Sequence, residues 1–152
     1  MKYLYFVSLV LLLSCGTRRT SAYPPGANPV STPIISASNS DDFFMLIESS
    51  TDPDYGYTEA KPVQVGGAAQ EEGPYHERKY LNGLRGPNGE DVTYRRIMSC
   101  CHFKTPNGYD GVGLLDVYEV NWEGAEKPVR LYLNMYDASE VLVPVGLTSR
   151  VR

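Results

Sequence analysis

The sequence predicts a mainly β (α+β) fold: a small antiparallel β-sheet or sandwich domain with one short helix. Residues 129–136 alternate between apolar and polar side chains, which is the two-residue period of a strand with one buried face. The sequence contains twelve tyrosines, and tyrosine favours half-buried strand positions. Turn-forming Pro-Asn-Gly stretches at 87–89 and 106–108 separate the apolar runs of the second half.

The first fifteen residues predict a secretory signal of the lipoprotein type. Lys2 precedes an apolar run of about eleven residues, Tyr3–Leu13, and the small Ser14 then leads to Cys15. This run is too short for a transmembrane helix, which needs about 20 apolar residues. In lipoproteins the cysteine at this place carries acyl chains such as palmitate and becomes the mature N-terminus. We therefore expect residues 1–14 to be a signal peptide and Cys15 to be the lipid anchor, with an ordinary cleaved signal as the alternative.

Composition changes after the signal. Residues 15–41 are rich in Ser, Thr, Pro, Gly and Asn and show no regular period. We therefore expect them to form the lipidated N-terminus and a flexible tether. Residues 42–152 are expected to form a single β-rich globular domain. Without residues 1–14 the net charge is about −5, which argues against binding to nucleic acid.

Three elements are predicted in the first half of this domain. Residues 43–49 (FFMLIES) and 61–67 (KPVQVGG) are short strand candidates, because apolar residues dominate them and turn-forming residues follow. Residues 67–84 contain helix-forming residues over two to three turns. The buried stripe of this helix is expected to consist of Tyr80, Leu81 and Leu84.

The second half is expected to consist of strands. Residues 92–104 (VTYRRIMSCCHFK) form a strand candidate that stops at the turn 105–111 (TPNGYDG). Residues 114–137 are predicted to form a hairpin, because two alternating runs flank the polar stretch EGAEKP. A last strand is expected over 139–149, and Pro144 within it suits the edge of a sheet.

Two adjacent cysteines lie among other possible soft ligands. Met98, Cys100, Cys101 and His102 fall within five residues, and ligands of these types suit Cu(I) or zinc. In a regular strand, however, neighbouring side chains point to opposite faces, so both thiols reach one metal only if the strand bulges. The alternatives are a vicinal disulfide between Cys100 and Cys101 in an oxidising compartment, one buried and one exposed thiol, or redox chemistry.

Catalytic motifs are few. His76 and Glu77 could supply acid–base groups, since histidine titrates near neutral pH. The sequence lacks a Gly-x-Ser-x-Gly elbow, a phosphate-cradling glycine loop and an HExxH zinc motif. We therefore predict no catalytic residue, no enzymatic activity and no cofactor.

The residues that lead to Cys15, Leu12-Leu13-Ser14, resemble the lipobox of bacterial lipoproteins. Together with this lipobox, several motifs resemble those of a group of small Bacteroidota lipoproteins with no established activity. These motifs occupy 52–58, 65–67, 77–82, 84–89, 99–101, 113–119 and 133–137, and the resemblance covers about residues 52–147. Some members bear the name 2-dehydro-3-deoxyphosphooctonate aldolase. Such an enzyme resembles a TIM barrel of about 250 residues, whereas residues 42–152 predict a much shorter body built of hairpins. The sequence therefore predicts no aldolase.

Three functional hypotheses follow. The first is a non-catalytic envelope lipoprotein, held at the membrane by Cys15, that binds another envelope protein or a glycan. The second is a metal-binding or redox protein, and the third an enzyme. Residues 16–19 (GTRR) are neutral and then basic, whereas surface export in Bacteroidota is associated with acidic residues at this place. We therefore expect the periplasmic face of the outer membrane.

Overall fold

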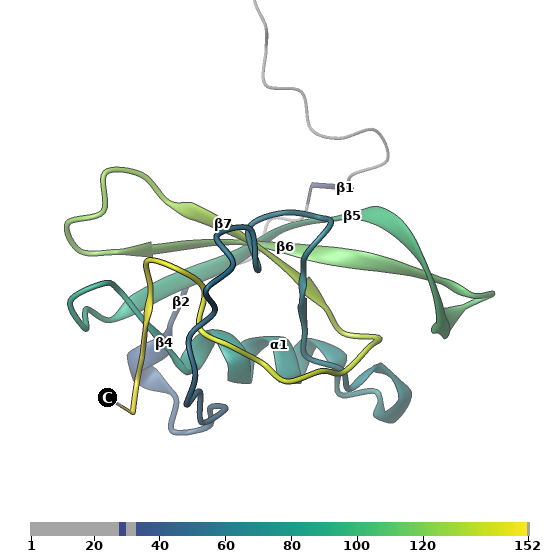
Figure 1. Cartoon of the computed structure of the whole chain (residues 1–152), viewed down its shortest axis with the longest axis horizontal. Coiled ribbons are helices and arrows are strands. Elements are labelled where there is room, and N and C mark those ends of the chain that lie inside the picture. Colours follow the sequence, from purple (N-terminus) through teal and green to yellow (C-terminus); the bar gives the residue numbers. More distant parts are fainter. Residues whose placement is uncertain (1–27, 30–32, 152) are drawn as a thin grey trace, which may run out of the picture.

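A computed structural model describes residues 28–29 and 33–151 of the chain (Figure 1). The prediction of a mainly β fold with one short helix is confirmed. The described elements are β1 (Asn28–Pro29), β2 (Ile35–Ser36), the 3₁₀ turn η1 (Ala37–Asn39), β3 (Val63–Gln64), the 3₁₀ turn η2 (Ala68–Gln70), α1 (Gly73–Asn82), β4 (Leu84–Arg85), β5 (Val92–Tyr109), β6 (Val112–Trp122), β7 (Val129–Asn134) and β8 (Thr148–Ser149).

The main sheet is built around the long strands β5 and β6. Its order is β1-β5-β6-β7-β3, and β2 pairs with a second part of β5. All of these pairs are antiparallel except β3 with β7, which makes the sheet mixed. Strands β4 and β8 form a separate two-stranded sheet. The predicted strand at 61–67 is therefore present as β3, although it is only two residues long.

The β6–β7 hairpin agrees with the sequence pattern, whereas β5 is longer than expected. Strands β6 and β7 pair over Asp116–Val120 and Val129–Leu133, as the alternation predicted. Strand β5 continues beyond its expected end, so the turn to β6 contains only Asp110 and Gly111. Their φ values are 50° and 75°, and a two-residue hairpin turn with positive φ at both positions favours the sequence Asp-Gly. The tip of this hairpin projects beyond the rest of the sheet (Figure 1).

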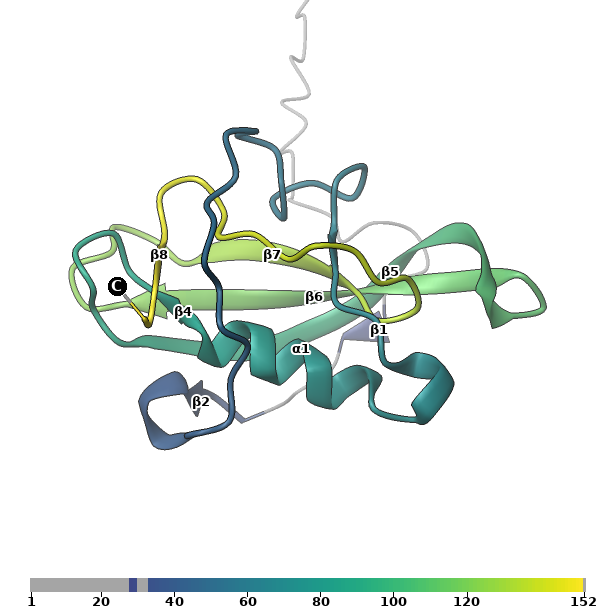
Figure 2. The same ribbon diagram turned by 60° about the horizontal axis from the view of Figure 1, so that its bottom comes forward.

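Helix α1 packs across one face of the sheet (Figure 2). It begins with a proline in its first turn, where the missing N–H leaves no helical hydrogen bond unmade. Of the predicted buried stripe, Tyr80 and Leu81 lie on the helix and are 0% exposed. Leu84 is also 0% exposed, but it lies beyond the end of the helix, in β4. Opposite the helix lie inward-facing residues of β5, β6 and β7, among them Tyr94, Val120 and Leu131. The main core thus lies between the helix and the sheet.

Two predicted strands differ in the structure. Residues 43–49 do not join a sheet, and their one ladder contact is the isolated bridge from Ser49 to Val143. Their backbone is bonded instead to the end of α1, where the Phe44 N–H donates to the Lys79 carbonyl. Of residues 139–149, only β8 is a strand, because Pro144 cannot donate to a ladder and the chain turns after it.

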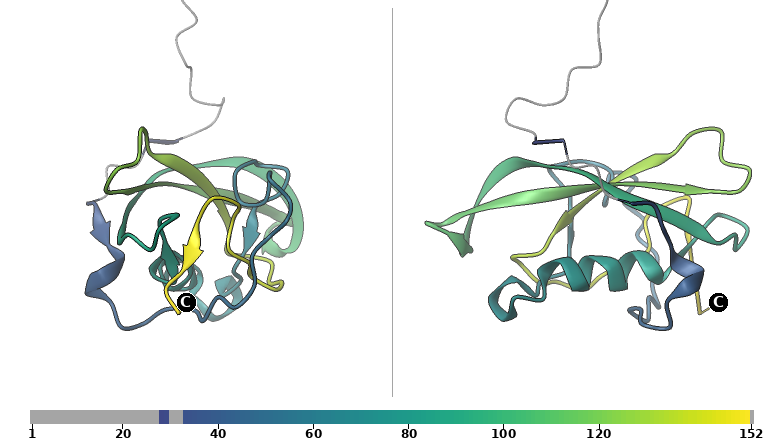
Figure 3. Two further views of the ribbon diagram at one scale, coloured as in Figure 1. Left: turned by 60° about the vertical axis from the view of Figure 1, so that its left-hand side comes forward. Right: turned by 180° about the vertical axis from the view of Figure 1, so that it is seen from behind.

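The segment from 33 to 41, which we expected to be the end of a flexible tether, packs on the folded body. Ile35 and Ser36 pair with β5, and Ala37 is 0% exposed within the main core. The Arg150 guanidinium donates to the carbonyls of Ala37 and Ser40. Figure 3 shows β2 and η1 beside the helix. A composition rich in Ser and Pro therefore did not prevent this segment from covering the edge of β5.

Candidate functional site

A β-bulge in the middle of β5 determines which side chains face the helix. Arg96 pairs with Tyr118, whereas Met98 pairs with the preceding residue of β6, Val117, so Ile97 is the extra residue. Residues paired across antiparallel strands lie on the same face of a sheet. Arg96 therefore shares the helix-facing side with Tyr118, and Met98 shares the opposite side with Val117. After the bulge, Ser99 faces the helix, while Met98 and Cys100 face the opposite side.

The bulge brings two donors from β5 to one carboxylate of β6. Ser99 pairs with Asp116, and its hydroxyl donates to Asp116 Oδ1 over 2.7 Å. Arg96 Nη2 donates to the same oxygen over 2.5 Å, and it also contacts the Ser99 hydroxyl. The Asp116 side chain is only 2% exposed, while that of Arg96 is 30% exposed. Such charge-assisted hydrogen bonds are what a buried carboxylate requires.

A second buried carboxyl approaches this group from the helix. Glu77 is 0% exposed, and the Tyr118 hydroxyl donates to its Oε2 over 2.9 Å. Burial raises the pKa of Glu77 well above its usual range, and the negative charge of Asp116 raises it further. Burial and the Glu77 carboxyl also raise the pKa of the Tyr118 hydroxyl, which therefore stays a donor. The buried Glu77 carboxyl therefore holds its proton more tightly than an exposed glutamate does.

If both carboxyls were ionised, two of their buried oxygens would have no hydrogen-bond donor. They are Glu77 Oε1 and Asp116 Oδ2, and both are buried. A hydrogen bond with Asp116 is one of the causes that raise the pKa of Glu77. One proton on Glu77, donated to Asp116, would satisfy both oxygens. The pair then carries a single negative charge, which Arg96 balances.

A cleft lies directly over this buried group. Its volume is about 260 Å³. The walls come from β2 and the nearby Pro33, from the first turns of α1 and from β5 and β6. The lining residues are Pro33, Ile35, Pro74, Arg78, Arg96 and Tyr118. Arg96 and Tyr118 belong both to the cleft wall and to the buried network. No aspartate or glutamate lines the cleft.

Arg78 supplies a second guanidinium to the cleft. It lies one helical turn after Pro74 and is exposed. Within residues 33–151 it has neither a hydrogen-bond partner nor an ion-pair partner. The next residue, Lys79, is paired with Asp42 over 3.2 Å. The charge of Arg78 is therefore available to a ligand.

The structure does not bring His76 and Glu77 together, although they are neighbours in sequence. Successive residues of a helix point in different directions. His76 Nδ1 lies 3.1 Å from the Val65 carbonyl, and Nε2 lies 3.4 Å from a Glu72 oxygen. Glu77 faces the sheet instead and contacts Tyr118. The two residues therefore cannot act as one acid–base pair.

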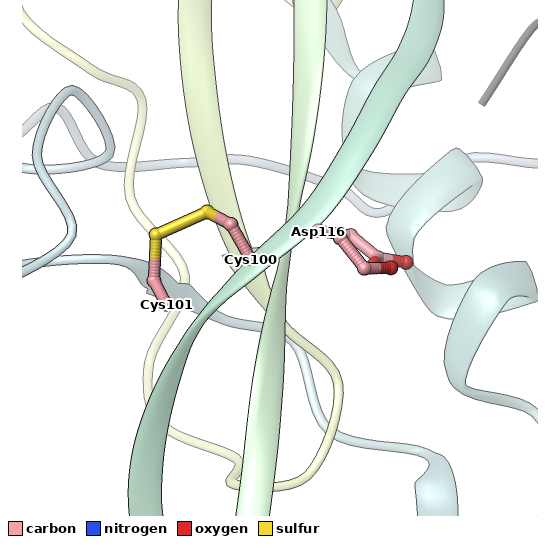
Figure 4. Close-up of a disulfide and its surroundings, with 4 residues drawn as sticks. Cys100, Cys101 and Asp116 are labelled. Atoms are coloured by element: carbon pink, nitrogen blue, oxygen red, sulfur yellow. A yellow bond between two sulfur atoms is a disulfide. The ribbon is translucent and has the colours of Figure 1, made fainter. Parts of the chain in front are cut away.

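Cys100 and Cys101 form a vicinal disulfide, with their Cα atoms 3.7 Å apart. Figure 4 shows this disulfide and Asp116 on opposite sides of the β5–β6 pair. Met98 and Cys100 are buried on the side away from the helix, whereas His102 is exposed. While the disulfide is closed, neither sulfur is a thiolate ligand. In the part of the chain that the structure describes, no three His, Cys, Asp or Glu side chains form a metal site.

Several residues of the site were missed by the sequence analysis. They are Arg78, Arg96, Ser99, Asp116 and Tyr118. One signal was present: Asp116 stands between two apolar residues of a predicted strand, and a charged residue at such a place is usually paired when buried. The others gave no local signal: the bulge in β5 brings Ser99 to the same side as Arg96, and Arg78 comes from the helix.

Cys15, the predicted lipid anchor, lies outside the described residues. None of the helices described for 28–29 and 33–151 is long and apolar enough to span a bilayer. No family model, curated protein or solved structure matches the chain.

Proposed function

We propose that this protein is a lipid-anchored envelope protein with a non-catalytic, ligand-binding role, and that the cleft over the Glu77–Asp116 pair is its binding site. The observation that carries this proposal is the composition of the cleft wall. Two guanidiniums and a tyrosine converge there with apolar side chains, above a buried titratable pair. Ligand sites typically combine an apolar lining with a few convergent polar groups and perturbed titratable residues.

The position of the carboxyl pair favours binding over catalysis. A general acid must come within hydrogen-bond reach of the substrate. Glu77 and Asp116 are 0% and 2% exposed, and neither lines the cleft. Instead, Glu77 accepts from the Tyr118 hydroxyl and Asp116 accepts from Arg96 Nη2, and both of these donor residues line the cleft. Their proposed role is therefore to hold these two side chains in place.

The proposed location follows from the sequence. The signal-like residues 1–14, the lipidation motif at Cys15 and the resemblance to Bacteroidota lipoproteins support a lipid anchor in the outer membrane. We place the body on the periplasmic face, where the partner would be another envelope protein or a glycan.

Photo-crosslinking in intact cells tests this proposal. A diazirine residue at Pro74, on the cleft wall, is expected to capture one envelope component in the membrane fraction. The same residue at Tyr109, which is 88% exposed near the hairpin tip, serves as the control outside the cleft. A second change, Arg78→Glu, should abolish capture at position 74, and Cys15→Ala should release the chain from the membrane fraction. Equal labelling at both positions, or none at 74, would contradict a binding role for the cleft.

A redox role is the second candidate, and the vicinal disulfide is the observation that favours it. Cys101 is partly exposed, and a dithiol donor that reduced the bridge would supply two electrons, giving two thiols and an oxidised donor.

Thiol counting on chain purified from the envelope checks the state of the bridge. We expect no alkylation of Cys100 or Cys101 before reduction, and two adducts after treatment with dithiothreitol. If both thiols are already free in the isolated protein, and a metal that is lost in Cys100→Ala accompanies them, the metal hypothesis replaces both proposals.

A further inference from the structure

We propose that the cleft binds a carboxylate carried on a short apolar group, with Arg78 as its main ionic partner. This inference rests on the proposed binding function and names the ligand class. The volume of about 260 Å³ limits the bound group, since clefts for drug-sized ligands measure roughly 300–1,000 Å³. The ligand is therefore a small molecule or the terminal group of a larger one.

The charge of the cleft selects a monoanion. Arg96 is already balanced by Asp116 over 2.5 Å, and burial, which raises the pKa of Glu77, favours the neutral form of that carboxyl. Arg78 adds one uncompensated positive charge at the cleft wall. A carboxylate would neutralise it, whereas a phosphate with close to two negative charges at neutral pH would leave one charge unbalanced.

The backbone around the cleft also argues against phosphate. Phosphate sites commonly use several free backbone N–H groups at a glycine-rich loop or a helix start. Here the first turn of α1 contains Pro74, which has no N–H, and no glycine lines the cleft. Guanidinium groups, by contrast, match a carboxylate with two parallel hydrogen bonds.

The rest of the lining selects an apolar substituent next to the carboxylate. Pro33, Ile35 and Pro74 offer only carbon side chains, and together they provide the apolar part of the lining. The Tyr118 hydroxyl donates to Glu77 and so has no proton left for the ligand, while its ring adds to the apolar wall. Two sources share this chemistry: a free short branched acid and the terminal residue of a peptide.

Calorimetric titration of the full chain in detergent tests the inference. The probes are isovalerate, N-acetylalanine, N-acetylalanine amide and inorganic phosphate. We expect isovalerate or N-acetylalanine to bind one per chain, and the neutral amide to bind at least about tenfold more weakly, because it lacks the charge that Arg78 pairs with. Arg78→Gln should weaken carboxylate binding by at least about tenfold. Arg130→Gln, on the opposite face of the sheet, is the matched control and should leave binding unchanged.

The outcomes separate the two sources and the two proposals. Tighter binding of N-acetylalanine than of isovalerate would indicate a peptide terminus, and the reverse order would indicate a free acid. Equal binding of the acid and its amide, phosphate binding as tight as carboxylate, or an unaffected Arg78→Gln variant would overturn the inference. If no probe binds while crosslinking at position 74 persists, the ligand class is wrong and the binding function stands. If crosslinking also fails, the proposed function itself is wrong.

Discussion

Asp116→Ala is expected to lower the free energy of unfolding by about 3 kcal/mol. Asp116 is 2% exposed and accepts hydrogen bonds from Arg96 and Ser99. Removing one partner of a buried ion pair leaves the other charge without compensation, which typically costs about 3–5 kcal/mol. We expect the lower end of this range, because 30% of the Arg96 side chain is exposed and water can partly solvate its charge. Urea unfolding of the purified chain at neutral pH measures the effect.

A double variant separates the lost ion pair from the lost packing. When both members of a buried pair are replaced by apolar residues of similar volume, the change in stability is often small. Arg96→Met combined with Asp116→Leu should therefore recover most of the loss. A single Asp116→Ala variant within about 1 kcal/mol of the wild type would show that Arg96 and Asp116 are not the coupled pair that the hydrogen bonds indicate.

Glu77→Gln is expected to make stability less dependent on pH and to stabilise the chain at pH 8. Burial raises the pKa of Glu77 in the folded state, whereas the unfolded chain has the ordinary value of about 4.3. The folded state therefore binds this proton more tightly. Its contribution to stability is fully present below the unfolded pKa and is lost as pH rises toward the folded pKa. Glutamine cannot ionise, yet it can accept from Tyr118 and donate to Asp116, as the protonated glutamate does.

Denaturant unfolding at pH 5 and pH 8 measures this difference. The charged and titratable groups that face Glu77 are Asp116, Tyr118 and Arg96, and all three remain in the variant. Glu126→Gln, in the exposed loop between β6 and β7, is the matched control and should follow the wild type at both pH values. The assignment of the proton to Glu77 fails if the two stabilities of Glu77→Gln differ by as much as those of the wild type.

Local patterns were sufficient to predict the helix and the β6–β7 hairpin. The alternation at 129–136 identified β7 and its buried face, and Tyr80 and Leu81 identified the buried stripe of α1. The apolar pattern wrongly predicted a strand where a segment makes contacts with distant residues in place of the hydrogen-bond ladder of a sheet. Residues 43–49 have strand-like composition, but Met45 and Ile47 are 69% and 73% exposed. The segment's backbone is bonded to Lys79 of α1 and to Val143 rather than to a strand of a sheet.

The candidate site was predictable only in fragments. Glu77 was considered for acid–base chemistry, but its partners come from two strands that follow it in sequence. A single extra residue, Ile97, decides that Ser99 faces the helix while Cys100 faces away from it. Regular alternation would instead place even-numbered residues such as Cys100 beside Arg96. No sequence period marks a bulge, so this arrangement needs the pairing of β5 with β6.

The segment that leads into the body from its N-terminal side also builds the cleft. Pro33 and Ile35 form part of the wall, and β1 and β2 hold their segment to β5 through only two paired residues each. If the chain is tethered at Cys15, a mechanical pull between body and membrane acts first on these short strands. Peeling β2 away would remove one wall of the cleft while leaving α1 and the long hairpins intact. In a chain tethered in this way, tension would open the proposed binding cleft before it disrupts the long hairpins.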